Sequence, residues 1–267
     1  MRVFRRQLLS LAPLALLAGC DGRAADELLH VSFDATRTLL HAWEQAFRAT
    51  SVGGAVLASH GGSGKQTRSV AEGLDADLVS LAVASDVDLL ARMGHLSPDW
   101  RARLPQESSP LASTVVMLVR RGNPKHVRTF EDLARDDLVV LTPNPKTSGG
   151  ARNNHLAVYG ALVARGDEAA AVRVVKKIYR SAPVLPAGAR LALTTFLDRG
   201  VGDVLLAWES EAHLAQTAFG KGRVEVVTPP RTLRCDVPLA LVDRVVYGRG
   251  SRARAEVYAE LAYGEQG

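Results

Sequence analysis

Cysteine and regularly spaced metal ligands are scarce in this chain of 267 residues. Only two cysteines occur, Cys20 and Cys235, and they lie far apart in the sequence. The seven histidines show no metal-ligand spacing either. Because protein metal sites need several cysteine, histidine or carboxylate ligands at short spacings, the sequence predicts no metal site and no cofactor.

Runs of like charge are missing as well. The formal net charge is +5, yet Arg2, Arg5 and Arg6 lie in a segment, residues 1–19, that contains no acidic residue. Subtracting these three arginines leaves +2, and the remaining basic residues are interspersed with aspartates and glutamates. Nucleic-acid-binding proteins carry clustered basic residues, so this distribution predicts no nucleic-acid partner.

The apolar run near the N-terminus, residues 8–17, is too short to cross a bilayer as a helix. Because it follows the three arginines, we predict that residues 1–19 are a secretion signal peptide. With 47% hydrophobic and 23% charged residues, the chain as a whole has the composition of a globular protein.

The end of this run, LAGC at residues 17–20, resembles the lipobox of bacterial lipoproteins. The resemblance implies cleavage before Cys20, lipid on that cysteine, and residues 20–27 as anchor and spacer. Asp21 resembles the inner-membrane retention residue of some Gram-negative lipoproteins. An ordinary signal peptide beside a chance cysteine is the alternative. With Cys20 lipidated, Cys235 has no partner, so we expect no internal disulfide in the mature chain.

The most informative stretch that the chain does contain is SHGGSGKQTR, residues 59–68. Its three glycines let the backbone approach a ligand closely. A helix over residues 65–74 is predicted to follow, with Ser63 as N-cap and Gln66 completing a capping box. Backbone N–H groups at a helix start lie at the positive end of the helix dipole, so this stretch predicts an anion site.

The same construction recurs further along the chain. It appears as KTSGGAR at residues 146–152 and, in weaker form, as PAGAR at residues 186–190. We therefore predict that several helix N-termini converge on one small anion.

Strand-like and helix-like segments alternate along most of the chain, which is typical of α/β proteins. We predict two α/β lobes, joined by strands that cross near residues 110–118 and 228–238. Lobe I takes residues 28–112 and 232–267, and lobe II takes residues 113–231. Asp34 is the predicted N-cap of the first helix. Strands are predicted over residues 27–33, 56–58, 77–82, 113–119, 137–142, 201–208, 224–228 and 237–246, and helices over 35–49, 65–74, 85–93, 129–134, 151–165, 168–180 and 252–262, with another starting at 209.

Two enzyme motifs are incomplete in residues 59–68. A phosphate-binding loop would need glycine at Ser59 and serine or threonine at Gln66. A serine-hydrolase elbow would need glycine at Lys65. We therefore predict a binding protein, not an enzyme.

Longer motifs carry a resemblance to a known family. SHGGSGKQ (residues 59–66) and TPNPKTSGGAR (residues 142–152) are similar to the two signatures of the bacterial sulfate/thiosulfate-binding proteins. VSFDATR (residues 31–37), GAR (188–190) and GDVLLAWE (202–209) match that family in order and spacing. The similarity extends from Leu28 to about Tyr263.

That family consists of periplasmic receptors with the two-lobed, type II periplasmic-binding-protein fold. They hold the anion in the interlobe cleft and deliver it to an ABC importer. The resemblance thus implies sulfate or thiosulfate as ligand, permease subunits as partners, and a periplasmic location, here with a lipid anchor in the inner membrane. Another tetrahedral oxyanion (molybdate, tungstate or phosphate) and a transport-inactive binding or sensor lipoprotein are the alternatives.

The ligand groups carried over by position are all uncharged donors. They are the backbone N–H groups of Asp34, Ser63, Gly149, Gly150 and Ala189, the Ser148 hydroxyl and the Trp208 indole N–H. We expect Lys65, Arg152 and Arg190 to lie beside the site rather than on the ligand, with Arg190 paired to the Asp34 carboxylate.

Each of these residues also has an ordinary structural interpretation. The serines could be helix N-caps, the paired glycines a turn, and Trp208 a core residue. The chain also departs from the family pattern at Asn153, where relatives have an aromatic residue, and at Ala35, where they have proline. It ends at Gly267, where relatives continue with further helices, so the resemblance implies a C-terminally shortened form.

Overall fold

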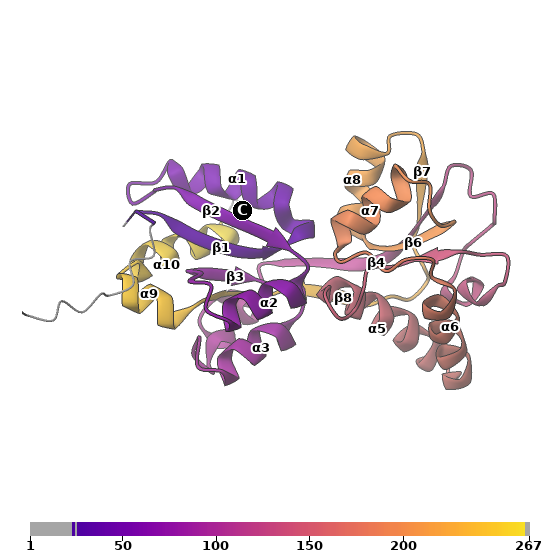
Figure 1. Cartoon of the computed structure of the whole chain (residues 1–267), viewed down its shortest axis with the longest axis horizontal. Helices are drawn as coiled ribbons and strands as arrows, with labels where there is room; N and C mark the ends of the chain where they lie inside the picture. The colour runs from indigo at the N-terminus through magenta and orange to yellow at the C-terminus, as the bar shows by residue number, and fades with distance from the viewer. Residues whose placement is uncertain (1–22, 25, 265–267) are drawn as a thin grey trace, which may run out of the picture.

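Two separate sheets organise the molecule, one on each side of Figure 1. The computed structural model describes residues 23, 24 and 26–264, so the predicted signal peptide and Cys20 lie outside the described residues. The strand order is β2-β1-β3-β9 in the first sheet and β5-β6-β4-β7 in the second, with β8 paired to β4. The predicted two-lobed α/β architecture is confirmed, and we call the parts built on the two sheets lobe I and lobe II.

Lobe I combines three parallel strands with one antiparallel strand. On helix α1, Leu40, Trp43 and Phe47 are buried at helical spacing, as their pattern predicts. The strands are β1 (Leu28–Phe33), β2 (Val56–Gly61), β3 (Leu78–Ser80) and β9 (Leu239–Leu241). The helices are α1 (Arg37–Arg48), α2 (Ser63–Ala71), α3 (Ala84–Arg92), the short turn α4 (Pro105–Ser108), α9 (Asp243–Arg249) and α10 (Arg252–Glu260), with 3-10 turns at Asp34–Thr36, Trp100–Ala102 and Leu261–Tyr263.

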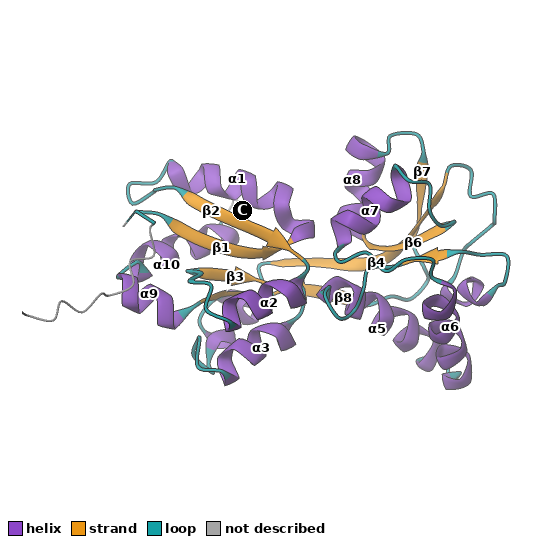
Figure 2. Ribbon diagram, viewed as in Figure 1, coloured by secondary structure: helices purple, strands orange, loops and turns teal. Residues whose placement is uncertain are grey.

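Lobe II is built around the long strand β4 (Leu111–Arg120), which runs from one lobe into the other (Figure 1). Its first four residues pair with β8, and its later residues pair with β6 and β7. The exact lobe boundaries stay a prediction. The other strands are β5 (Val140–Leu141), β6 (Val204–Trp208), β7 (Val224–Val227) and β8 (Arg234–Val237). The helices, purple in Figure 2, are α5 (Gly149–Val163), α6 (Glu168–Ser181), α7 (Ala189–Leu197) and α8 (Glu209–Leu214), with short turns at Phe130–Ala134 and Ala215–Phe219.

The predicted strand over residues 237–246 is wrong. The structure divides this stretch into the end of β8, the short strand β9 and the start of helix α9. The valines are the reason for the error, because they favour strands on average. Here Val242, Val245 and Val246 are buried at helical spacing, and Gly250 ends the helix with a left-handed φ of 67°.

A buried histidine links the sheet of lobe I to helix α10. The His30 ring nitrogens lie 3.0 Å from the Tyr258 hydroxyl and 2.9 Å from the Ser80 hydroxyl. Burial, with a smaller effect of His60, lowers the pKa of His30 to about 3. The folded protein therefore stays unprotonated at His30 at pH values where the unfolded chain already takes up a proton.

We expect His30 to destabilise the fold in acid. As the pH falls from 6.5 toward 3, the free energy of unfolding should decrease by about 1.4 kcal/mol per unit, or about 2 kcal/mol at pH 5. His30→Gln should remove this component, measured as the difference between the urea-unfolding profiles of variant and wild type. His41→Gln, at an exposed position, is the control. Parallel profiles for His30→Gln and wild type would contradict the prediction.

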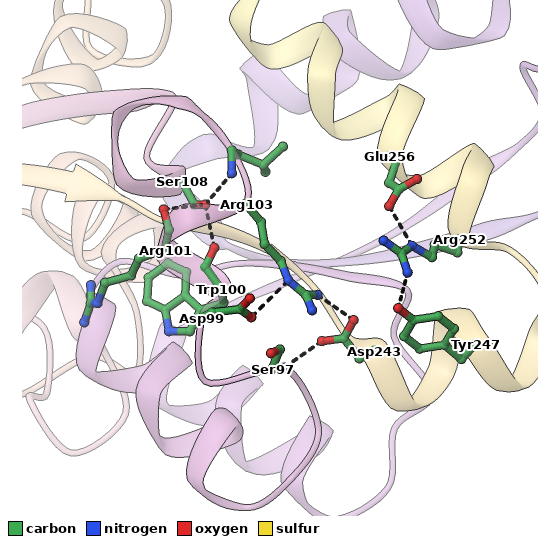
Figure 3. Close-up of polar contacts among 11 residues, drawn as sticks. Ser97, Asp99, Trp100, Arg101, Arg103, Ser108, Asp243, Tyr247, Arg252 and Glu256 are labelled. Carbon is green, nitrogen blue, oxygen red and sulfur yellow. Dashed lines mark hydrogen bonds and ion pairs between the residues drawn. The ribbon is translucent and has the colours of Figure 1, made fainter.

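The turn α4 contains three consecutive residues with left-handed backbone. The φ angles of Gln106, Glu107 and Ser108 are 53°, 54° and 58°. The Ser108 hydroxyl closes the turn by donating to the Trp100 carbonyl at 2.7 Å, and it accepts from the Leu104 N–H at 3.1 Å (Figure 3). Left-handed backbone costs an ordinary L-residue about 1–2 kcal/mol.

Glu107→Gly is therefore expected to stabilise the protein. Glycine adopts this φ freely, but it also loses more conformational entropy on folding. With this cost subtracted, the free energy of unfolding should rise by roughly 0.5–1 kcal/mol. The Glu107 side chain is exposed, so little packing is lost. Thermal unfolding measures the effect, and Gln45→Gly within α1 should have the opposite sign. A lower melting temperature for Glu107→Gly would refute the strain interpretation.

Candidate functional site

The predicted backbone donors lie at the starts of helices or 3-10 turns, and those of lobe I come just after strands. Asp34 follows β1, and Ser63 begins α2 just after β2. In lobe II, Gly149 and Gly150 begin α5 and Ala189 begins α7. Because the first N–H groups of a helix have no partner within it, each of these residues has a donor available to a ligand or a neighbouring group.

The two lobes bring these helix starts together. A Cβ atom added at Gly149 would lie 2.9 Å from the Ser63 Cβ of lobe I. A Cβ at Gly150 would lie 3.1 Å from the Phe33 ring of lobe I and 3.4 Å from the Trp208 indole nitrogen. The predicted residues from the two lobes are therefore neighbours, although they are far apart in the sequence.

Trp208 is held with its ring against Phe33, at 4.9 Å between ring centroids. The residue is 3% exposed, and its Nε1 has no hydrogen-bond partner among the described residues. A small cavity beside it is also lined by Gly150 and Ala189. A buried donor without a partner is costly, so this N–H is suited to an acceptor from a bound anion.

The two serines of the predicted site differ in their hydroxyl contacts. Gly62, not Ser63, is the N-cap of α2, so the predicted capping box is wrong. The Ser63 hydroxyl instead donates to Asp86 at 2.6 Å and accepts from the Ala82 N–H at 3.1 Å. Ser148 is the N-cap of α5: its oxygen accepts from the Ala151 N–H at 3.3 Å, which leaves its proton for a ligand.

The basic residues beside the site are directed elsewhere. Arg152 pairs with Asp86 at 2.5 Å, between lobe II and lobe I. Lys65 has an exposed side chain, and its backbone N–H donates to the Thr147 carbonyl at 3.2 Å. With Arg152 neutralised by a carboxylate, the N–H groups and helix dipoles supply the attraction for an anion.

The predicted pairing of the Arg190 guanidinium with Asp34 is wrong. This guanidinium pairs with Glu211 at 2.8 Å. The backbone N–H of Arg190, at the start of α7, donates to Asp34 Oδ2 at 3.2 Å. Asp34 is also not the N-cap of α1, because it begins a 3-10 turn and Thr36 precedes the helix. Burial raises the pKa of Glu211 to about 7, although Arg190 opposes the shift.

Asp86 and Glu211 are the site neighbours that the sequence did not reveal. Asp86 lies in the first turn of α3 and Glu211 in the first turn of α8. Neither belongs to a glycine motif, and only the buried cross-element pairs show their role.

The described part of the chain contains neither a metal-ligand cluster nor a membrane-spanning helix. No group of three or more histidine, cysteine or acidic side chains there could hold a metal ion. None of its helices is long and apolar enough to span a membrane.

With this geometry established, comparison with known proteins gives the family. Residues 31–267 match the model of the bacterial extracellular solute-binding proteins. The chain belongs to this family. The sulfate-binding protein of Escherichia coli K12 is 44% identical over 260 residues, or 94% of this chain and 79% of that protein. The thiosulfate-binding protein of Pseudomonas aeruginosa is 41% identical over 273 residues, or 100% of this chain and 81% of that protein.

Solved structures agree with this family assignment. The sulfate-binding protein SubI of Mycobacterium tuberculosis has a TM-score of 0.82 and 32% identity to this solute-binding protein, covering 90% of this chain and 82% of its own. A periplasmic thiamin-binding protein has a TM-score of 0.70 and is 14% identical, with 90% of this chain and 80% of that chain covered. At this identity the likeness supports the fold alone. The predicted type II periplasmic-binding-protein fold is confirmed.

Replacing Trp208 by phenylalanine tests the indole donor. The variant should keep the ring packing on Phe33 but lose the N–H. A hydrogen bond to a charged group is worth about 1.5–3 kcal/mol, so sulfate should bind at least about tenfold more weakly. Calorimetric titration measures the change. Trp100→Phe, in lobe I, loses a comparable indole bond to Asp88 and should bind sulfate normally. An unchanged dissociation constant for Trp208→Phe would show that Trp208 is only a core residue.

Proposed function

We propose that this solute-binding protein is a sulfate receptor of the cell envelope, which also accepts thiosulfate. The observation that carries the proposal is the convergence of helix starts from both lobes beside the unpartnered indole N–H of Trp208. The bound anion would take the N–H groups of Asp34, Ser63, Gly149, Gly150 and Ala189, the Ser148 hydroxyl and the Trp208 indole.

Uncharged donors are sufficient for tight binding. Seven hydrogen bonds to a dianion contribute about 1.5–3 kcal/mol each, against association costs of about 4–15 kcal/mol. A dissociation constant in the micromolar range or below, which corresponds to roughly −8 kcal/mol or better, is therefore within reach. Relatives named for sulfate and thiosulfate that match nearly the whole chain support this choice of ligand.

The transport role follows from the same proposal. We infer that the protein is held in the periplasm by lipid on Cys20 and delivers its anion to the permease subunits of an ABC importer. As a receptor it would need affinity and release, and no chemical step on the ligand.

Calorimetric titration of the purified protein against sulfate, thiosulfate, molybdate and phosphate tests the proposal. We expect sulfate or thiosulfate to bind with one site per chain and micromolar or tighter affinity. If only molybdate binds, the proposed ligand is wrong and the protein is a receptor for a different oxyanion. Absence of binding by all four anions would contradict the receptor function.

A further inference from the structure

The Asp34 carboxylate lies at the contact between the lobes. Asp34 is 6% exposed and follows β1 of lobe I, yet its Oδ2 accepts from the Arg190 N–H at the start of α7 in lobe II. A carboxylate at the N-terminus of a helix satisfies free N–H groups and interacts favourably with the helix dipole.

The surroundings of Asp34 match this capping contact. A Cβ atom at Gly188, the residue before α7, would lie 2.4 Å from Asp34 Oδ2, so only glycine permits the approach. The guanidinium of Arg190 is taken by Glu211, which leaves the helix start as the partner of Asp34. Burial raises the pKa of Asp34, while the N–H groups of Arg190 and Ala189 oppose the shift.

We propose that the Asp34 side chain is an interlobe latch, a cap that lobe I supplies to helix α7 of lobe II when the cleft is closed. This inference rests on the proposed sulfate-receptor function and goes beyond it, because it assigns a positioning role to the side chain in addition to the backbone N–H of Asp34. When the lobes separate, both partners lose the contact. When they close, capping of α7 and presentation of the Asp34 N–H to the anion occur together.

The test compares Asp34→Ala, which removes the cap, with Asp34→Asn, which keeps an acceptor oxygen of the same reach. Stopped-flow tryptophan fluorescence measures the rate of sulfate dissociation, and small-angle X-ray scattering measures how closed the sulfate-saturated protein is. We expect Asp34→Ala to release sulfate at least tenfold faster and to be more open than the wild type. Asp34→Asn should stay within about threefold of the wild-type rate.

Asp243→Ala is the matched control. Asp243 also accepts a backbone hydrogen bond, from the Ser97 N–H at 2.6 Å, but both residues lie in lobe I (Figure 3). This variant should lose stability and release sulfate at the wild-type rate, which separates a latch from a general structural effect.

Three results would overturn the latch. The first is an Asp34→Ala variant that releases sulfate at the wild-type rate or more slowly. The second is an Asp34→Asn variant that releases sulfate as fast as Asp34→Ala does. If wild-type protein does not bind sulfate, the proposed function fails separately. In that case, small-angle X-ray scattering without any anion tests the latch alone. The third result that would overturn it is an Asp34→Ala protein that is no more open than the wild type.

Discussion

Gly62→Ala is expected to weaken sulfate binding about a hundredfold or more, with lobe I still folded. A Cβ atom at this position would lie 2.5 Å from the Thr147 carbonyl oxygen and 2.7 Å from the Ala187 carbonyl oxygen, both in lobe II. Backbone atoms cannot rotate away as a side chain can, so the lobes would have to move apart. The φ of Gly62 is −61°, which alanine adopts without strain.

The defect should therefore appear in closure and not in folding. Calorimetry measures the loss of affinity, where a hundredfold change corresponds to about 2.7 kcal/mol. Small-angle scattering with saturating sulfate should show a more open molecule. Gly160→Ala is the control, because a Cβ atom there, in helix α5, meets nothing within 4 Å. Wild-type affinity in Gly62→Ala would show that the lobes do not close as tightly as the structure indicates.

The second large effect is the choice between sulfate and phosphate. All groups proposed for the site donate hydrogen bonds. Sulfate is fully ionised near neutral pH and accepts at every oxygen, whereas phosphate keeps at least one hydroxyl that needs an acceptor. An unpaired buried group costs about 1–3 kcal/mol. When the phosphate hydroxyl faces a protein donor, both the hydroxyl and that donor are left without a partner. We expect sulfate to bind roughly 10²- to 10⁴-fold more tightly than phosphate.

The side chains that could accept from phosphate make other contacts, and only Asp34 Oδ1 and Glu211 Oε2 among their carboxylate oxygens have no partner among the described residues. The Asp34 carboxylate caps α7, with Oδ2 3.2 Å from the Arg190 N–H. The Nδ1 atom of His60 lies 2.6 Å from the Ser32 hydroxyl. Competition calorimetry, with phosphate displacing sulfate, measures the ratio. Comparable affinities would mean that a carboxylate such as Asp34 or Glu211, or His60, faces the ligand.

Much of the site was predictable because its elements are local. Glycine-rich turns before helices depend on residues adjacent in the chain, so the starts of α5 and α7 follow from short patterns, and the anion site at residues 59–68 stays a prediction from the same kind of pattern. The alternation of apolar strands and amphipathic helices likewise predicted two α/β lobes. Local preference failed where β-branched residues lie in a helix, at Val245 and Val246 of α9.

The partners of the polar side chains were decided only by the tertiary structure. Arg152 and Asp86 are 66 residues apart, and Arg190 and Asp34 are 156 apart, yet each pair meets across the lobes. Because a carboxylate must not face a bound anion, the sequence predicted that the Arg190 guanidinium pairs with Asp34. In the folded chain that guanidinium pairs with the buried Glu211, and Asp34 contacts the N-terminus of α7 instead. Such choices depend on which buried charges and donors lie within about 3 Å after the two lobes have come together.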